Sequence, residues 1–233
     1  MATGFYDANG IWQYGEDDNI ALFSDTLNKL ADSTSDAFTS DRSRLSTLEA
    51  GSLAGLIPVK PGTVTAVTGT AAVNNVGLVT FTGCTKIQLD GVFNSRYTHY
   101  KLLLSVTSSA ANSMIQFRFI QSGSENSSAN YYIQNVEASG SSISTYRQAG
   151  ISGLNDFSYG VAGNPSTTEA NIYNPFTSVK PQVMSRTARD LYNGAGIMET
   201  HGGINLTNSF TGISIISNTS NITGKAIVYG WNE

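Results

Sequence analysis

The sequence predicts a mainly β protein, in which a short N-terminal peptide and a coiled-coil helix precede a β-sandwich or jelly-roll domain. Three observations carry this prediction: an apolar stripe with heptad-like spacing near the N-terminus, about ten short strand-like segments after it, and a composition rich in Gly, Ser, Thr and Asn. The 233 residues are 40% hydrophobic and only 13% charged. Such a chain can bury a sizeable core, although its charge is low for a protein of this size.

Residues 1–17 form a peptide that is too short to fold alone and too aromatic to be an ordinary disordered tail. Docking onto another protein is its expected use, because Tyr and Trp bury a large area at modest entropic cost. Folding back onto the helix that follows is the alternative. The residues expected to make the contact are Phe5, Tyr6, Ile11, Trp12 and Tyr14.

A helix is predicted over residues 18–50, with a length of roughly 50 Å at 1.5 Å per residue. Its apolar stripe advances in steps of three and four residues, which keeps one seam directed toward a partner helix. Thr34 and Asp41 interrupt the stripe, so the coiled coil is expected to be weak by itself. The alternative is a single amphipathic helix lying on the β domain. The predicted seam consists of Ile20, Phe23, Leu27, Leu30, Phe38, Leu45 and Leu48.

Gly and Pro residues over 51–62 end the helix and predict a hinge, after which residues 63–233 form the β domain. Closely spaced strands without helical segments between them favour a sandwich or jelly roll over an α/β enzyme. The Gly- and Pro-containing segment 150–175 is predicted to be a long loop, the usual place of a variable binding surface. The expected strands are 63–67, 78–82, 86–89, 97–106, 114–120, 131–136, 143–146, 179–185, 210–216 and 226–230.

The charge and cysteine content exclude several classes of function. The formal charge is −4 and the pI is about 5.1, so no basic patch exists to release counterions from a nucleic acid. Cys84 is the only cysteine, which excludes an internal disulfide and a cysteine-based zinc site. No segment approaches the roughly 18 consecutive apolar residues of a membrane span. We therefore expect neither a nucleic-acid partner nor membrane insertion.

The sequence does not predict an enzyme. His99 and His201 have no Cys or His neighbour at metal-ligand spacing, and the motifs of nucleophile elbows, phosphate loops and dinucleotide sites are missing. The acidic residues of the β domain are scattered along the chain. Two of them could still converge in space as a glycosidase pair, which is the alternative. We expect no catalytic residue, metal or cofactor.

Tyrosines and short polar side chains in the β domain are candidates for ligand binding. Tyrosine rings stack on sugars, and Asn and Asp side chains form hydrogen bonds with hydroxyl groups. For each tyrosine the alternative is an ordinary place in the core or in a subunit interface. The candidates are Tyr131, Tyr132, Tyr146, Asn155, Asp156, Tyr159 and Tyr173.

Two N-terminal segments resemble the beginning of small fibre or minor tail proteins of phages that infect actinobacteria. Residues 10–18 read GIWQYGEDD and residues 23–31 read FSDTLNKLA. Four later segments are similar to the β domain of the same proteins. They are VTFTG at 79–83, LDGVF at 89–93, YTHYKLLL at 97–104 and GKAIVYGW at 224–231.

The resemblance implies a homotrimeric virion component. Residues 1–17 would then be a virion-anchoring peptide that contacts other virion structural proteins, and the jelly-roll head would point outward. The implied function is that of a tail fibre or receptor-binding protein, which attaches the phage to a glycan or protein on the host cell surface. The alternative is a capsid fibre or decoration protein with a structural role and no specific receptor. In either case the expected place is the exterior of the tail or capsid, and the resemblance brings no catalytic residue.

Overall fold

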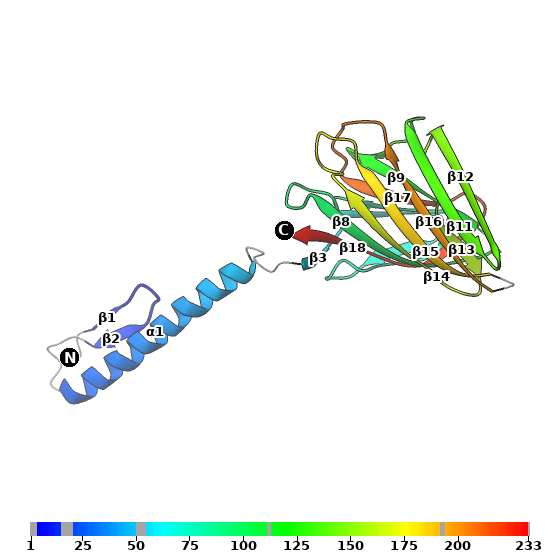
Figure 1. Cartoon of the computed structure of the whole chain (residues 1–233). Helices are drawn as coiled ribbons and strands as arrows, with labels where there is room; N and C mark the ends of the chain where they lie inside the picture. Colours follow the sequence, from blue (N-terminus) through cyan, green and yellow to red (C-terminus); the bar gives the residue numbers. More distant parts are fainter. Residues whose placement is uncertain (1–3, 15–20, 50–54, 111–112, 192–193, 233) are drawn as a thin grey trace. The chain divides into compact units, whose positions relative to one another are not determined.

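The computed structural model describes residues 4–14, 21–49, 55–110, 113–191 and 194–232 (Figure 1). The chain divides into an N-terminal unit, residues 1–54, and a β unit, residues 55–233. The described residues are mainly in β-strands, and they contain one α-helix. The prediction of a mainly β protein is therefore confirmed.

The N-terminal unit begins with a two-stranded hairpin made of β1, Gly4–Tyr6, and β2, Trp12–Tyr14. The carboxylate of Asp7 organises its turn, because Oδ1 accepts hydrogen bonds from the backbone N–H groups of Asn9 and Ile11, both at 2.9 Å. The bond from Ile11 is the main reason why the pKa of Asp7 lies below its ordinary value. A local hydrogen-bond network thus shapes a segment that has no core of its own.

The hairpin packs on the helix that follows it in the chain. Helix α1 spans Ala21–Glu49, and residues 18–20 and 50 of the predicted helix lie outside the described residues. Asn9 Nδ2 donates a hydrogen bond to Ser35 Oγ, and Ala31 is buried. Folding back onto the helix, the alternative use of the N-terminal peptide, is therefore what the structure has for residues 4–14.

The aromatic and apolar side chains of this unit remain largely uncovered. Phe5 and Tyr6 of the hairpin are 59% and 67% exposed, and Leu30 and Phe38 of the predicted seam are 62% and 58% exposed. Leu27 is half-buried. Ile20 lies outside the described residues, and so do the side chains of Trp12, Tyr14, Phe23, Leu45 and Leu48.

The larger sheet of the β unit is built from ten strands: β3 Gly55–Val59, β5 Thr70–Val73, β6 Val79–Cys84, β8 His99–Ser108, β11 Tyr131–Ser139, β12 Ser142–Ile151, β14 Ser166–Tyr173, β15 Gln182–Leu191, β16 Gly194–Ile204 and β18 Ile222–Asn232. Its main order is β12-β11-β16-β15-β14-β8-β18. The other edge of β18 pairs with β6 near its start and with β3 near its end, and β5 pairs with β6.

The second sheet contains β4 Thr63–Val67, β7 Lys86–Asp90, β9 Ser113–Gln121, β10 Ser124–Glu125, β13 Leu154–Ala162 and β17 Gly212–Ser217. Its order is β13-β9-β17-β7-β4, with β10 paired to β9. The last residues of β13 also pair with β8 in parallel. Strand β13 therefore joins the two sheets at one side.

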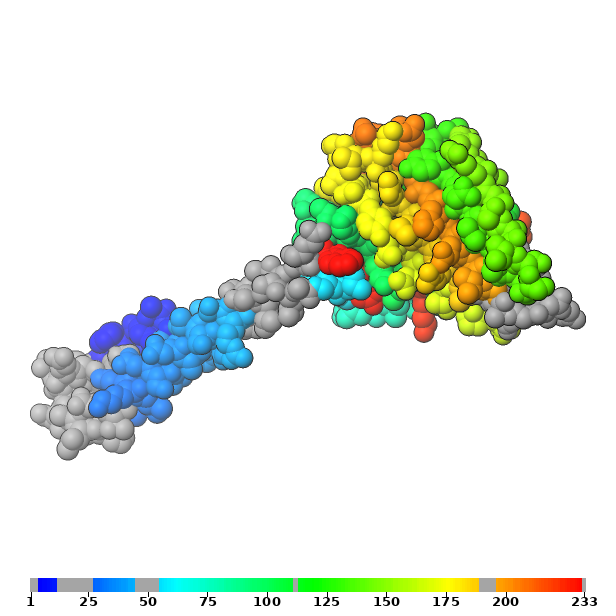
Figure 2. Space-filling model, in the orientation of Figure 1, coloured from blue at the N-terminus to red at the C-terminus, as the bar shows by residue number. Residues whose placement is uncertain are grey.

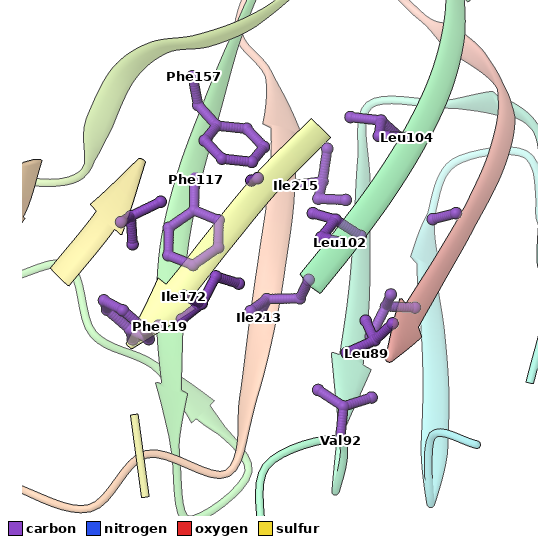
Figure 3. Packing of buried hydrophobic residues seen from close by; sticks show 14 of the residues in the cluster. Leu89, Val92, Leu102, Leu104, Phe117, Phe119, Phe157, Ile172, Ile213 and Ile215 are labelled. Atoms are coloured by element: carbon purple, nitrogen blue, oxygen red, sulfur yellow. The ribbon is translucent and has the colours of Figure 1, made fainter. Parts of the chain in front are cut away.

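Side chains from both sheets fill the space between them, as in a β-sandwich. Alternate residues of β8 are buried, so this strand directs one face inward. In β9, Ile115, Phe117 and Phe119 face the core, and Gln116 and Ile120 are buried as well. Figure 3 shows Leu102 of β8, Phe117 of β9 and Ile213 of β17 in one apolar cluster. Phe117 also packs against Phe157 of β13, with ring centroids 5.0 Å apart. This core fixes the position of every outward-facing residue of the sheets.

The predicted hinge and the predicted long loop are both partly wrong. The hinge, 51–62, contains β3, which pairs with the C-terminal strand β18. The loop, 150–175, contains β13 and β14, and β14 lies between β8 and β15 in the larger sheet. Strands β5 and β16 were not expected either. The strands of the β unit therefore begin inside the predicted hinge, at Gly55, and continue through the region expected to vary.

Strand β14 was not predicted because small residues occupy most of its buried positions, so its sequence shows little hydrophobic alternation. Three of its four buried positions hold the small residues Ser166, Thr168 and Ala170, and the fourth holds Ile172. Thr168 Oγ1 lies 2.6 Å from Ser158 Oγ and 2.9 Å from Thr187 Oγ1, so three buried hydroxyl groups form a hydrogen-bonded chain. Because the hydroxyl groups satisfy one another, they can be buried without a large desolvation penalty.

Strand β16 was not predicted for a similar reason, because glycine occupies several of its positions. A Cβ atom added to Gly202 would lie 2.4 Å from the backbone oxygen of Tyr132 and 2.9 Å from Cδ2 of Leu154. Only glycine allows the neighbouring backbone and side chain to approach so closely. Four of its eleven residues are glycine, and only Ile197, Thr200 and Ile204 are β-branched, so the pattern by which strands are recognised in a sequence is weak here.

Candidate ligand-binding surface

The seven predicted ligand-binding residues divide between the interior and the surface of the β unit. Tyr131 is fully buried. Its hydroxyl group accepts a hydrogen bond from the N–H of Phe119 at 2.9 Å and donates one to the backbone oxygen of Asn126 at 3.0 Å. Burial raises the pKa of Tyr131. This tyrosine fixes the 126–131 segment to β9 and cannot contact a ligand.

Asp156 lies at an irregularity of β13, with a φ of 52° and with 9% of its surface exposed. The hydroxyl group of Tyr146 on β12 donates a hydrogen bond to its Oδ2 atom. Burial raises the pKa of the Asp156 carboxyl group. Burial also raises the pKa of half-buried Tyr159, and the charge of Asp156 adds to the effect. These residues belong to the contact between β12 and β13.

Asn155 extends the same contact. Its Oδ1 atom accepts a hydrogen bond from Gln116 Nε2 at 2.5 Å, and its Nδ2 atom donates one to Gln148 Oε1 at 3.2 Å. Gln116 comes from β9 and Gln148 from β12. Asn155 therefore ties the edge strand of the larger sheet to the second sheet, and its polar groups already have protein partners.

The two remaining candidates, Tyr132 and Tyr173, lie on the outer face of the larger sheet. They belong to one row of directly paired residues that crosses six strands, from β11 through β16, β15, β14 and β8 to β18. The rings of Tyr173 and His99 meet edge to face, with centroids 5.2 Å apart. The row consists of Tyr132, Gly203, Gln182, Tyr173, His99 and Trp231.

We call this set the aromatic row. At about 4.8 Å between neighbouring strands, the five steps from Tyr132 to Trp231 span roughly 24 Å. Trp231 is 53% exposed, and Tyr132, Tyr173 and His99 are half-buried. Figure 2 shows residues of β11, β12, β14, β15 and β16, in green, yellow and orange, on the face turned to the viewer. The row thus provides ring surface across much of one face.

Gly203 allows the ring of Tyr132 to lie across the neighbouring strand. A Cβ atom at position 203 would be 3.0 Å from the Tyr132 hydroxyl oxygen, 3.3 Å from its Cζ atom and 2.4 Å from the backbone oxygen of Pro181. The side chain of Tyr132 therefore extends over β16. Its ring orientation depends on the absence of a side chain at this one position.

Two adjoining depressions lie beside the aromatic row, each with a volume of about 270–280 Å³. Met184 and His201 line both, so the depressions adjoin one another, and together we call them the outer groove. The end nearer β12 is lined by the side chains of Tyr132, Gln134, Arg147, Gln182, Met184 and His201. The end nearer β14 is lined by Glu169, Asn171, Met184, Arg186, Glu199 and His201.

Ion pairs neutralise most of the charge in and beside the outer groove. Arg186 NH2 lies 2.5 Å from Glu199 Oε1, and its Nε atom donates to the same oxygen at 2.7 Å. Lys101 Nζ lies 2.6 Å from Glu169 Oε1. Arg147 is exposed and forms no ion pair with any residue that the structure describes. Besides these ion pairs, the groove therefore offers amides, an imidazole, a thioether and the guanidinium group of Arg147.

The described ranges contain no cluster of three or more His, Cys, Asp or Glu residues that could hold a metal ion. Within the same ranges, no helix is long and apolar enough to cross a membrane.

Comparisons with known proteins add little to these observations. No family model matches the chain, and no curated protein matches it. Among solved structures, the chain is similar to the endo-1,3-β-glucanase of Streptomyces sioyaensis at 8% identity, with 72% of this chain and 82% of the glucanase chain covered. The TM-score of 0.17 is too low to support an argument about fold or activity.

Sequence reasoning missed most of the outer groove. It selected Tyr132 and Tyr173, but it did not select Arg147, His201 or Trp231 as ligand-binding residues. Each of these lies at an outward position of a strand. Their alternation with buried neighbours was a usable signal at Trp231, whereas the strand that holds His201 was not recognised at all.

Proposed function

We propose that this protein is a phage fibre protein that attaches the particle to its host, and that the outer groove binds a cell-surface glycan. One observation carries the proposal: the aromatic row, in which Trp231 is exposed and Tyr132, Tyr173 and His99 are half-buried, lies beside a groove lined with amide and charged side chains. Sugar rings present C–H faces that pack on aromatic rings, and their hydroxyl groups pair with amides. The length of the row suits several linked sugars better than a single one.

The resemblance to small fibre and minor tail proteins supports a place on the virion. Phe5 and Tyr6 project from the N-terminal hairpin with most of their surface exposed. Large aromatic side chains of this kind are typical anchors in protein interfaces. We infer that the hairpin, together with its helix, contacts other virion proteins on the exterior of the tail or capsid.

A homotrimer with a coiled coil is part of the same proposal. Leu30 and Phe38 are exposed in a single chain. Burying them between helices would stabilise an assembly by about 25 cal/mol for each Å² of apolar surface removed from water. Light scattering of the full chain, and of a shortened chain beginning at Gly55, tests this idea. A trimer of the full chain would support this idea. A trimeric shortened chain would then assign assembly to the β unit, and a monomeric shortened chain would assign it to the helix. Monomers in both cases would contradict it.

The strand order favours a jelly roll within the sandwich. One sheet contains β7-β17-β9-β13, and the other contains β8-β14 followed by β11-β12, with the β15-β16 hairpin inserted between these pairs. Without that hairpin, the two orders are those of the eight strands of a jelly roll. In this interpretation, the inserted hairpin contributes His201, Met184 and Gln182 to the outer groove.

An enzyme remains the second candidate because Glu169 and Glu199 line the same end of the groove. They lie on strands separated by one strand, which places their Cα atoms roughly 10 Å apart. Paired carboxylates at related separations hydrolyse glycosidic bonds. However, each of these carboxylates already pairs with a cation, so neither is held free for a water molecule or a leaving group. We therefore favour binding without catalysis.

Binding of the purified full chain to cells tests the attachment function. We expect the chain to bind host cells and to block phage adsorption. The double variant Tyr132→Ala with Trp231→Ala should lose about 1–3 kcal/mol, or roughly 5- to 150-fold in affinity. Tyr6→Ala is the matched control, because it removes an exposed tyrosine outside the aromatic row. It should leave cell binding unchanged.

Three results would count against the proposal. A purified chain that neither binds cells nor blocks adsorption at high concentration would favour the alternative, a capsid fibre or decoration protein with a structural role. Release of sugars from host polysaccharide, abolished by Glu169→Gln or by Glu199→Gln, would instead support the hydrolase. Unchanged binding of the double variant would remove the outer groove from the proposal.

A further inference from the structure

The charge of the outer groove differs from that of the whole chain. The chain carries a formal charge of −4. In and beside the groove, Arg147, Arg186 and Lys101 oppose Glu169 and Glu199, which gives +3 − 2 = +1. The two glutamates are engaged by Arg186 and Lys101. The surplus positive charge is therefore the guanidinium group of Arg147.

Neighbouring groups hold the surroundings of Arg147 in place. Gln134 lies directly opposite it on β11, and Gln134 Nε2 donates a hydrogen bond to the backbone oxygen of Tyr146 at 3.2 Å. One of the two donors of this amide is thus engaged by the protein. Arg147 remains exposed at the rim of the groove, so its donors can be directed toward a bound molecule.

Tyr132 and Arg147 lie close enough together for one saccharide to contact both. Tyr132 pairs with Ala149, and Gln134 pairs with Arg147, so the tyrosine and the arginine are diagonal neighbours, with Cα atoms about 7–8 Å apart. The Tyr132 side chain extends over β16, but Tyr132 and Arg147 line the same end of the groove. A saccharide that packs on Tyr132 could therefore place one of its substituents at the guanidinium group.

We propose that the outer groove selects an acidic saccharide, with one sugar ring on Tyr132 and a carboxylate or phosphate group of the saccharide paired with Arg147. This inference rests on the proposed glycan-binding function and names the chemical class of the glycan. A guanidinium group donates two parallel hydrogen bonds to a carboxylate or phosphate, which a neutral sugar cannot accept in the same way. His201 and Gln182 line the opposite side of the bound ring.

Calorimetry with the full chain tests the inference with three probes: an oligogalacturonide, its carboxyl-reduced neutral counterpart and a glycerol phosphate oligomer. We expect an acidic probe to bind at least about tenfold more tightly than the neutral one, and its affinity to fall as salt is added. The oligogalacturonide and the glycerol phosphate oligomer distinguish a carboxylate from a phosphate as the bound group.

Three variants assign the effect to Arg147. Arg147→Gln should reduce the affinity for the acidic probe at least about tenfold and leave that for the neutral probe unchanged. Arg147→Lys keeps the charge but lacks the planar pair of N–H donors, so its affinity for the acidic probe should lie between those of the wild type and Arg147→Gln. Lys29→Gln on α1 removes the same charge outside the groove and should have no effect. Because Arg147 is exposed, its substitution should not change the thermal midpoint of unfolding.

The outcomes separate this inference from the proposed function. Equal affinity of the wild-type protein for acidic and neutral probes, or full binding of the acidic probe by Arg147→Gln, would overturn the selection of acidic saccharides. Attachment through the groove would still stand if the Tyr132→Ala and Trp231→Ala double variant lost cell binding. If that double variant kept both saccharide binding and cell binding, both proposals would be contradicted.

Discussion

Replacing Thr168 with valine should measure the strength of the buried hydroxyl chain between the two sheets. Thr168 is fully buried and lies 2.6 Å from Ser158 Oγ and 2.9 Å from Thr187 Oγ1. Valine has nearly the same shape but no hydroxyl group, so the substitution removes both hydrogen bonds without creating a large cavity. Ser158 and Thr187 then remain buried, and each loses its hydrogen bond with Thr168 Oγ1.

At about 1 kcal/mol for each hydrogen bond, the expected loss in the free energy of unfolding is about 2 kcal/mol. For a unit the size of residues 55–233, this corresponds to a decrease of about 4–8 °C in the midpoint of thermal unfolding. Urea and thermal denaturation, followed by circular dichroism at pH 7, give both quantities.

Thr167→Val is the matched control because it makes the same change on the same strand at an exposed position. It should change the free energy of unfolding by less than about 0.5 kcal/mol. If Thr168→Val were as stable as this control, the hydroxyl chain would not stabilise the sandwich. The physical explanation given above for β14 would then be wrong.

Three further predictions concern the interior, the groove and the helix. Burial raises the pKa of Asp156 above 3.8, so the free energy of unfolding should fall as the pH rises through the folded-state pKa. Asp156→Asn should abolish this decrease and be at least as stable as wild type at pH 7 in urea titrations. Gly203→Ala should displace the ring of Tyr132 and weaken cell binding. Leu30→Ser combined with Phe38→Ser should weaken association of the full chain, so that light scattering gives a lower mass than that of a trimer.

Each of these changes has a control or a contrary result. An Asp156→Asn protein that is less stable than wild type at pH 7 would mean that the ionised carboxylate is favourable in the interior. Gly62→Ala is the control for the glycine substitution, since its Cβ atom would lie 3.7 Å or more from other atoms. Asp36→Ser is an exposed helix control, and dissociation of this variant as well would remove the seam from the argument.

Sequence patterns were sufficient where large apolar residues alternate with polar ones. The strand containing Leu102 and Leu104 and the strand containing Ile213 and Ile215 were both predicted, because their buried side chains are large and hydrophobic. The helix was predicted from the spacing of Leu27 and Leu30 for a similar reason. These elements form the framework of the β unit and of the N-terminal unit.

Patterns failed where the interior is built from hydroxyl groups or glycine. Thr168 and Gly202 occupy inward positions of β14 and β16, but neither residue type signals burial by itself. Whether a hydroxyl group can be buried depends on its partner, and here the partner comes from a different strand. Whether glycine belongs in a strand depends on which backbone or side chain approaches it.

The sequence by itself therefore determined the mainly β class, the position of the helix and the low surface charge, because these depend on local spacing and composition. Only the tertiary structure decided which tyrosines are buried and which are exposed. Tyr131 and Tyr132 are adjacent in the chain, yet one fills the core and the other lines the outer groove, because successive residues of a strand face opposite sides. The groove also combines residues from five strands, and their proximity follows from the strand order rather than from any spacing along the chain.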